Sequence, residues 1–110
     1  HGLLTRDPAN RPTAIFAHND QAALGALDAA AELGLGVPGD VSVVGYDNSQ
    51  LSRGASTNLT TVDLHGSDLG RDAAELALRR LADSDAPPET RTSTPSLVVR
   101  GTTGPVREAG

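Results

Sequence analysis

The sequence predicts an α/β fold built around a parallel β-sheet, and two observations carry this prediction. Residues 13–17 and 41–45 are short, continuous apolar runs, which are typical of strands buried on both faces. A stretch with helical periodicity lies between them. A helix of that length joins two neighbouring strands as a right-handed parallel crossover.

The first helix is predicted from its ends as well as from its apolar periodicity. Asn19 is a suitable N-cap, and Asp20 places negative charge in the first turn. Apolar residues then recur at three- and four-residue spacing from Ala23 to Ala31, until Gly34 supplies the C-cap. The following stretch "LGVPGD" turns the chain toward the second strand.

After the second strand, the predicted elements are short except for one long helix. Residues 48–58 are interpreted as an irregular loop with one short helical turn, 59–62 as a third extended segment and 96–100 as a final strand. The helix at residues 67–82 has an apolar arc of roughly 200°, which is wide for packing against one layer. Three or four strands are also few for a covered sheet. The chain is therefore predicted to be a fragment of a larger fold.

Composition and charge narrow the classes of function. A chain of 110 residues is predicted to form one modest domain or a part of one. Its net charge of −5 argues against a phosphate-binding surface on this segment. It contains no cysteine, which excludes disulfides and thiolate metal sites. No apolar run reaches the roughly 18 residues of a membrane span, and the start lacks a signal-peptide pattern, so we expect a soluble chain without membrane contact.

Four motifs occur together in one order: "NDQAALGAL" from Asn19, "GVPGDVSVVGYDN" from Gly36, "LTT" from Leu59 and "SLVVRGTTG" from Ser96. With this order and spacing, residues 11–104 resemble the C-terminal part of the LacI/GalR family of transcriptional repressors. The resemblance implies a partial three-layer parallel sheet of the periplasmic-binding-protein-like type. It also implies a cytoplasmic protein that binds DNA only through an N-terminal helix-turn-helix domain, which is absent from these 110 residues.

The resemblance further implies how the chain is divided. Residues 1–110 correspond to a C-terminal fragment of an effector-binding and dimerisation domain. Within it, residues 11–58 are the core of the C-terminal subdomain, 59–63 a crossover, 64–94 a helix and linker of the other subdomain, and 95–104 a returning strand. Residues 67–82 would then find the packing partners of their wide apolar arc in that other subdomain.

Polar side chains stand at the ends of the first two predicted strands. Because ligands bind at the carboxyl ends of parallel strands, the candidate ligand-binding residues are His18, Asn19, Asp20 and Asp47. Carboxylates accept hydroxyl hydrogen bonds and an amide both donates and accepts, which suits a sugar or related polyol. By resemblance, Asn19 and Asp47 match positions that hydrogen-bond the effector. The alternatives are helix capping for Asn19, a dipole contact for Asp20, a turn for Asp47 and solvent exposure for His18.

The sequence predicts a binding protein rather than an enzyme. It has no G-x-S-x-G elbow, phosphate loop or dinucleotide fingerprint. No cofactor is expected, and the candidate residues offer too few oxygen ligands for a hard cation and an unsuitable set for zinc. Leu64 stands where the family often has a polar residue facing the cleft, which indicates an effector less polar than a plain sugar. The alternatives are a periplasmic-type sugar-binding protein of an importer, with the same fold, and a stand-alone signalling module, which the incomplete sheet disfavours.

The resemblance also implies a homodimer, with an interface that includes the first helix and the loop after Asp47. Leu24 and Leu51 are the candidate interface residues, and core packing is the alternative for both. The wide apolar arc of residues 67–82 predicts in addition that the isolated chain self-associates. Folding of this helix back over the incomplete sheet is the alternative.

Overall fold

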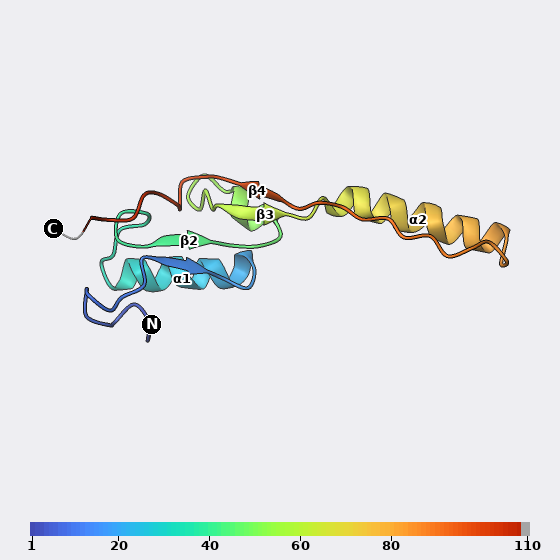
Figure 1. Ribbon diagram of the computed structural model, residues 1–110. Helices are drawn as coiled ribbons and strands as arrows, with labels where there is room; N and C mark the ends of the chain where they lie inside the picture. Colours follow the sequence, from blue (N-terminus) through green and yellow to red (C-terminus); the bar gives the residue numbers. More distant parts are fainter. Residues whose placement is uncertain (109–110) are drawn as a thin grey trace.

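Two parallel strands and the helix between them form the centre of the molecule. Strand β1 (Ala14–Phe16) pairs with β2 (Ser42–Val44), with Ile15 opposite Val43, and α1 (Asp20–Glu32) connects them. These elements belong to a computed structural model, which describes residues 1–108 (Figure 1). The predicted parallel crossover and the α/β class are confirmed.

The ends of α1 follow the capping residues of the sequence. The side chain of Asn19 accepts a hydrogen bond from the backbone N–H of Ala22 at 2.8 Å, and this satisfies one of the free donors of the first turn. At the other end, Gly34 has a φ of +68°, a left-handed conformation that glycine adopts without steric cost. Both ends therefore lie where the capping signals predict them.

The core consists of two small clusters between α1 and the sheet. Each cluster combines small residues of α1 with β2 or neighbouring residues, and the buried members are Leu4, Ala29, Ala30 and Val41 in one and Ala23, Val43 and Leu59 in the other. Ile15 packs against the first cluster, so β1 also faces α1 through this residue. Because alanine and valine dominate both clusters, the apolar area buried on folding is small.

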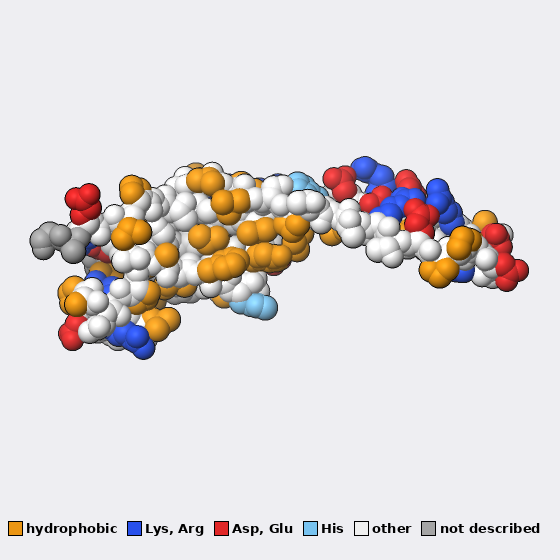
Figure 2. Space-filling view, in the orientation of Figure 1, with side chains coloured by type: hydrophobic (Ala, Val, Ile, Leu, Met, Phe, Trp, Pro, Cys, Tyr) orange, Lys and Arg blue, Asp and Glu red, His pale blue; other side chains and the backbone are white. Residues whose placement is uncertain are grey.

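The face of β1 opposite α1 is bare. Successive strand residues point to opposite faces, so Phe16 points away from the core, and its side chain is 69% exposed. Its ring lies 6.3 Å from that of Tyr46. Figure 2 shows hydrophobic side chains exposed over the body in the region of β1 and β2. The prediction that residues 13–17 are buried on both faces is therefore wrong for this chain, since no element of residues 1–108 covers this face.

Two crossing strands extend the sheet and lead out of it. Strand β3 (Thr61–Asp63) lies beside β2 through a parallel bridge between Thr60 and Val44, and β4 (Ser96–Val98) returns antiparallel to β3. Past β4, Thr102 accepts a hydrogen bond from the N–H of Val43 at 2.8 Å and donates its hydroxyl to the Val43 carbonyl at 2.7 Å. The return segment thus completes β2. The short 3-10 helix η1 (Gln50–Arg53) is the helical turn predicted in the loop after β2.

Helix α2 (Gly66–Ala82) projects from the body as an arm. We call residues 64–94 the arm and residues 1–63 and 95–108 the body; together they extend over 64 × 26 × 23 Å (Figure 1). No residue of α2 is buried, and Leu81 is 83% exposed. Figure 2 shows mixed charges along the arm and hydrophobic side chains near its tip. The alternative in which α2 folds back over the sheet is wrong.

The segment after α2 runs back along the helix. Arg91 holds it there, with Nη1 donating to Asp72 at 3.1 Å and to Glu75 at 2.6 Å, and with Nε donating to Glu89 at 3.0 Å. Arg79 donates to Glu89 and Arg80 to the carbonyls of Ser84 and Ala86, so several exposed contacts, each of which contributes little, hold the segment against α2. Neither α1 nor α2 combines the length and apolarity of a membrane span, and no other helix within residues 1–108 does so.

Candidate functional site

The structure brings the predicted strand-end residues into one neighbourhood. The N–H of Asp20 donates to the carbonyl of Tyr46 at 2.9 Å, which joins the start of α1 to the loop after β2. The N–H of Asp47 donates to the carbonyl of Val62 at 2.9 Å, which joins the same loop to β3. Three segments therefore meet at the carboxyl ends of β1 and β2, where parallel sheets bind ligands.

Asp47 is the exposed acid of this neighbourhood. Its side chain is open to solvent, and its carboxylate takes part in none of the hydrogen bonds formed within residues 1–108. Its φ of +104° is unusual for any residue other than glycine. Strained backbone of this kind gathers at functional sites, where neighbouring contacts maintain it. Asp47 thus presents a carboxylate with both oxygens available to a ligand.

Asn48 is the opposite case, because all of its polar groups are used inside the chain. Its N–H donates to Thr61 Oγ1 at 3.2 Å, and its Nδ2 donates to Asp63 Oδ2 at 3.1 Å. Its Oδ1 accepts from Arg100 Nη2 at 2.7 Å, and its carbonyl accepts from Arg53 Nη2 at 3.1 Å. Asn48 therefore fixes the loop that carries Asp47. The candidate residues predicted from the sequence did not include it.

Asp20 is buried and fully engaged, with 1% of its surface exposed. One oxygen, Oδ2, accepts from the N–H of Ser49 at 2.7 Å and from its hydroxyl at 2.8 Å; the other, Oδ1, accepts from Thr61 Oγ1 at 2.6 Å. These bonds connect the first turn of α1, the loop after β2 and β3. A direct contact of Asp20 with a ligand stays a prediction, whereas its positional role is visible in these contacts.

His18 and Asn19 lie at the rim of the same neighbourhood. Asn19 is half-buried and uses its Oδ1 to cap α1, which leaves its Nδ2 as the group that can donate to a ligand. His18 is exposed, two residues after the end of β1 at Phe16. The capping alternative for Asn19 is confirmed by the contact with α1. The ligand-binding roles of both residues stay predictions.

The crossing strands are tied together at the start of α2. His65 has a left-handed conformation with a φ of +54°, and its N–H donates to Asp63 Oδ1 at 2.8 Å. Its Nε2 lies within hydrogen-bond distance of Ser96 Oγ on β4. The backbone N–H of His65, followed by the side chain of Asn48, lowers the pKa of Asp63 below its ordinary value. Leu64, which lies between Asp63 and His65 in the sequence, is half-buried.

The predicted interface residues lie on two elements that contact each other, α1 and η1. Leu24 is half-buried on α1, and Leu51 lies in η1 with half of its surface exposed, 50%. The exposure of Leu51 agrees with its prediction as an apolar residue in a polar loop, and its role in an interface stays a prediction.

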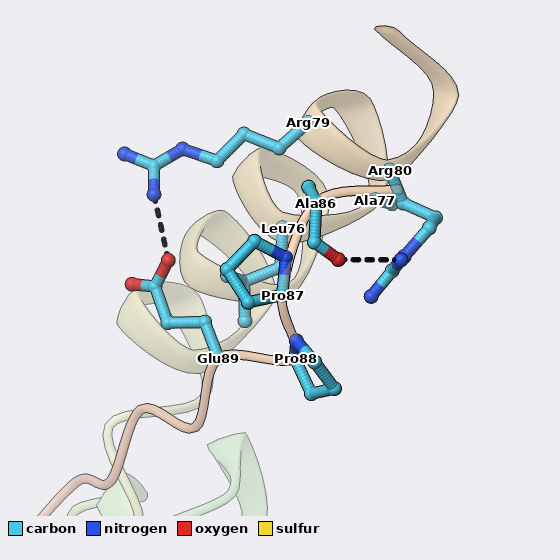
Figure 3. A pocket seen from close by; sticks show the side chains of 8 residues that line it. All are labelled: Leu76, Ala77, Arg79, Arg80, Ala86, Pro87, Pro88 and Glu89. Carbon is cyan, nitrogen blue, oxygen red and sulfur yellow. Dashed lines mark hydrogen bonds and ion pairs between the residues drawn. The ribbon is translucent and has the colours of Figure 1, made fainter. Parts of the chain in front are cut away.

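A hollow of about 440 Å³ lies elsewhere, between α2 and residues 86–89 (Figure 3). Its two arginines are occupied, because Arg79 donates to Glu89 at 2.6 Å and Arg80 donates to the carbonyl of Ala86 at 2.7 Å. None of the predicted ligand-binding residues lines it. Within residues 1–108, no group of three or more His, Asp or Glu side chains is arranged to hold a metal ion.

Comparisons with known proteins agree with the fold. Residues 2–103 match the family described as "Periplasmic binding protein-like domain". The "HTH-type transcriptional repressor PurR" of Mannheimia succiniciproducens is 46% identical over 91 residues, which cover 83% of this chain and 27% of that protein. The chain therefore spans about a quarter of the length of this relative.

Solved structures agree as well. A LacI-family transcriptional regulatory protein from Corynebacterium glutamicum has a TM-score of 0.77 and 46% identity, covering 94% of this chain and 40% of that one. A LacI-family regulator from Enterococcus faecalis, solved with bound ribose, has a TM-score of 0.80 and 35% identity, covering 86% of this chain and 35% of that one. The chain therefore belongs to the periplasmic binding protein-like domain family and corresponds to a part of the effector-binding domain of LacI-family transcriptional regulators.

Proposed function

We propose that this chain forms one wall of the effector-binding cleft of a transcriptional repressor, and that the effector is a sugar or a related polyol. The observation that carries the proposal is the exposed carboxylate of Asp47, which forms no hydrogen bond within residues 1–108. The loop that carries it is fixed by the hydrogen bonds of Asn48 with Thr61 and Arg100. An exposed acid on a fixed loop at strand ends is suited to ligand recognition.

The chemistry of the site supports the sugar class. A carboxylate accepts hydrogen bonds from two neighbouring hydroxyls, and the Nδ2 of Asn19 can donate to a third oxygen. The Enterococcus faecalis regulator, 35% identical to this chain, was solved with ribose. Both observations favour a polyhydroxylated effector. An anionic effector is disfavoured because the carboxylate of Asp47 would repel it.

The projecting arm supports a division of the chain between two subdomains. We assign residues 11–58 and 95–104 to one subdomain, residues 59–63 to the crossover and residues 64–94 to the other subdomain. Leu78, 66% exposed, and Leu81 would then pack against parts of that subdomain outside this chain. The relatives are regulators by name, which favours this role over the importer alternative.

The wider proposal concerns the protein of which this chain is a part. It would act in the cytoplasm as a homodimer, with Leu24 and Leu51 at the interface, and would bind DNA through an N-terminal helix-turn-helix domain. The name of the PurR relative supports this, since it is called an HTH-type repressor. The acidic balance of the present chain, −5, fits a part that does not itself contact DNA.

Titration with ribose and a panel of other sugars, followed by NMR of the 110-residue chain, tests the proposal. We expect the amide signals of Asn19, Asp47 and Asn48 to shift. Asp47→Ala should weaken binding by about one to two decades, because a hydrogen bond to a charged group contributes about 1.5–3 kcal/mol. Asp28→Ala, at an exposed acid of α1, is the matched control and should leave the affinity unchanged.

Two results would contradict the proposal. An unchanged dissociation constant in a folded Asp47→Ala variant would exclude the role of this carboxylate. Shifts produced by nucleobases but by no sugar would move the effector to a different class, one whose ring N–H groups would be the donors to Asp47.

A further inference from the structure

The conformation of Asp47 needs an external support. Its φ of +104° is disfavoured for a residue with a side chain, and its carboxylate forms no hydrogen bond within residues 1–108 that could offset this. Only its N–H is anchored, on the carbonyl of Val62. On the other side of Asp47, support comes from the neighbouring residue, Asn48, whose φ of +48° is also left-handed and whose N–H donates to Thr61 Oγ1 at 3.2 Å.

Arg100 is the charged donor that fixes the side chain of Asn48. Its Nη2 donates to Asn48 Oδ1 at 2.7 Å, and its Nη1 donates to the carbonyl of Leu59 at 2.8 Å and to Ser52 Oγ at 3.1 Å. The guanidinium is partly buried, and it belongs to none of the ion pairs formed within residues 1–108. Its charge is thus directed entirely at neutral oxygens, where charge-assisted bonds are strong.

The contacts at the two ends of the Asn48 amide define its orientation. The cation of Arg100 faces Oδ1, and the carboxylate of Asp63 faces Nδ2 at 3.1 Å. The reverse orientation would place the amide N–H groups against the guanidinium and the amide oxygen against the carboxylate, and both contacts would be repulsive. Arg100 and Asp63 together therefore leave Asn48 one arrangement, and Asp47 is attached directly to it.

We propose that Arg100 is the positioning residue for Asp47, acting through Asn48. Its relevance to effector binding rests on the proposed function, whereas its effect on the loop does not. Arg100 follows β4 in the segment that returns to the body from the arm. The placement of the ligand-facing acid thus depends on a residue 52 positions away from Asn48 in the sequence.

Arg53 offers a matched control within the same site. It also donates to Asn48, but to the backbone carbonyl at 3.1 Å, and it is exposed. Arg53→Gln and Arg100→Gln each remove one positive charge. Only Arg100→Gln removes a contact with the side-chain amide of Asn48, so the amide keeps its orientation in Arg53→Gln. The pair Arg100→Gln and Arg53→Gln therefore separates orientation of the side chain from a general effect of charge.

Amide hydrogen exchange of the 110-residue chain measures the support directly. In Arg100→Gln we expect exchange at the Asp47 and Asn48 N–H groups to accelerate by about tenfold to a hundredfold, the factor that corresponds to one charge-assisted bond. Arg53→Gln should change it by less than about threefold. The N–H of Ser42, bonded to Thr13 at 2.9 Å in the sheet, is the internal reference and should keep its rate.

Three outcomes would overturn the positioning role. One is unchanged exchange at Asp47 in Arg100→Gln; another is an equal acceleration at Ser42, which would show that Arg100 only stabilises the body. The third comes from the double variant with Asn48→Ala: additive effects would show that Arg100 does not act through Asn48. Should Arg100→Gln fail to fold, Arg100→Lys retains the charge but cannot reach three acceptors together, so the same local acceleration is expected.

Titration of these variants with ribose separates this inference from the proposed function. Accelerated exchange at Asp47 together with weaker ribose binding supports both. Accelerated exchange in variants whose ribose affinity equals that of the wild type would confirm the positioning role and contradict the use of Asp47 in binding.

Discussion

Replacement of Asp20 by alanine removes an acceptor that serves three donors in the interior. Two belong to Ser49, its N–H at 2.7 Å and its hydroxyl at 2.8 Å, and the third is the buried hydroxyl of Thr61 at 2.6 Å. Each buried donor left without a partner costs about 1–3 kcal/mol. Because the Ser49 hydroxyl can turn to water, we count two such donors and expect Asp20→Ala to lower the free energy of unfolding by about 2–6 kcal/mol.

Asp20→Asn should cost about half as much, because the contacts divide between the two oxygens and only one donor loses its acceptor. Both donors of Ser49 point at Oδ2, and the hydroxyl of Thr61 points at Oδ1. An asparagine with its oxygen toward Ser49 would present its N–H₂ to Thr61, whose hydroxyl can rotate and accept. The hydroxyl proton of Thr61 then lacks the acceptor that Asp20 supplied, so one buried donor is unpaired and about 1–3 kcal/mol is lost.

Urea unfolding at constant pH, followed by far-ultraviolet circular dichroism, gives the order of the variants. Asp28→Ala is the control on the same helix, at an exposed acid, and should stay within about 0.5 kcal/mol of the wild type. If Asp20→Ala and Asp28→Ala cost the same, the reasoning is refuted. A role of Asp20 in ligand contact alone would instead lower the affinity for the effector and leave the unfolding curve in place.

Three further predictions concern the sheet, the crossing strand and association. Gly45→Ala would place a methyl group 2.8 Å from Leu59 and closer still to the start of α1. We therefore expect the free energy of unfolding, measured with urea, to fall by about 1–3 kcal/mol. An unshifted urea midpoint would contradict the close approach. The pKa of Asp63 is lowered in the folded state, so its carboxylate contributes stability above about pH 4, and this contribution is lost as the pH falls through the folded-state pKa. Asp63→Asn should therefore make the free energy of unfolding less dependent on pH in the acid range. An identical dependence on pH in this variant would refute the assignment. Sedimentation should show concentration-dependent self-association, weakened by Leu81→Asp if α2 is the contact surface or by Leu51→Asp if η1 is; a monomer over a roughly tenfold dilution range would exclude both.

The local part of the fold could be predicted because its signals are local. Asn19 and Gly34 cap α1 through bonds and dihedral angles within one turn, so the sequence around them contains all the information. The exposure of Phe16 could not be predicted in this way. An apolar run looks the same whether or not a further layer covers the strand, and the covering layer is not encoded in the run itself.

The positions of the candidate residues near the strand ends could be predicted, but their surroundings could not. Strand ends located Asp47 and Asp20 correctly, yet both are acids next to a polar neighbour, and only the fold shows that one is exposed and the other is buried. The partners of Asp20 lie 29 and 41 positions away, in Ser49 and Thr61. Arg100 ends an apolar run, which indicated a strand boundary and gave no sign of a bond to Asn48.

The return segment also determines when the body can be finished during synthesis. On the edge away from β1, β2 pairs with Thr60 near its carboxyl end and with Thr102 at Val43, 59 positions beyond Val43. The N–H of Gly104 also donates to Ser42 Oγ, at a separation of 62. Closing such long loops costs only slightly more free energy than closing short ones, but contacts of high sequence separation form slowly. A ribosome-bound chain therefore carries this edge of β2 paired only at Thr60 until residues 102–104 have emerged. During that interval, the open edge is exposed to pairing with strands of other nascent chains.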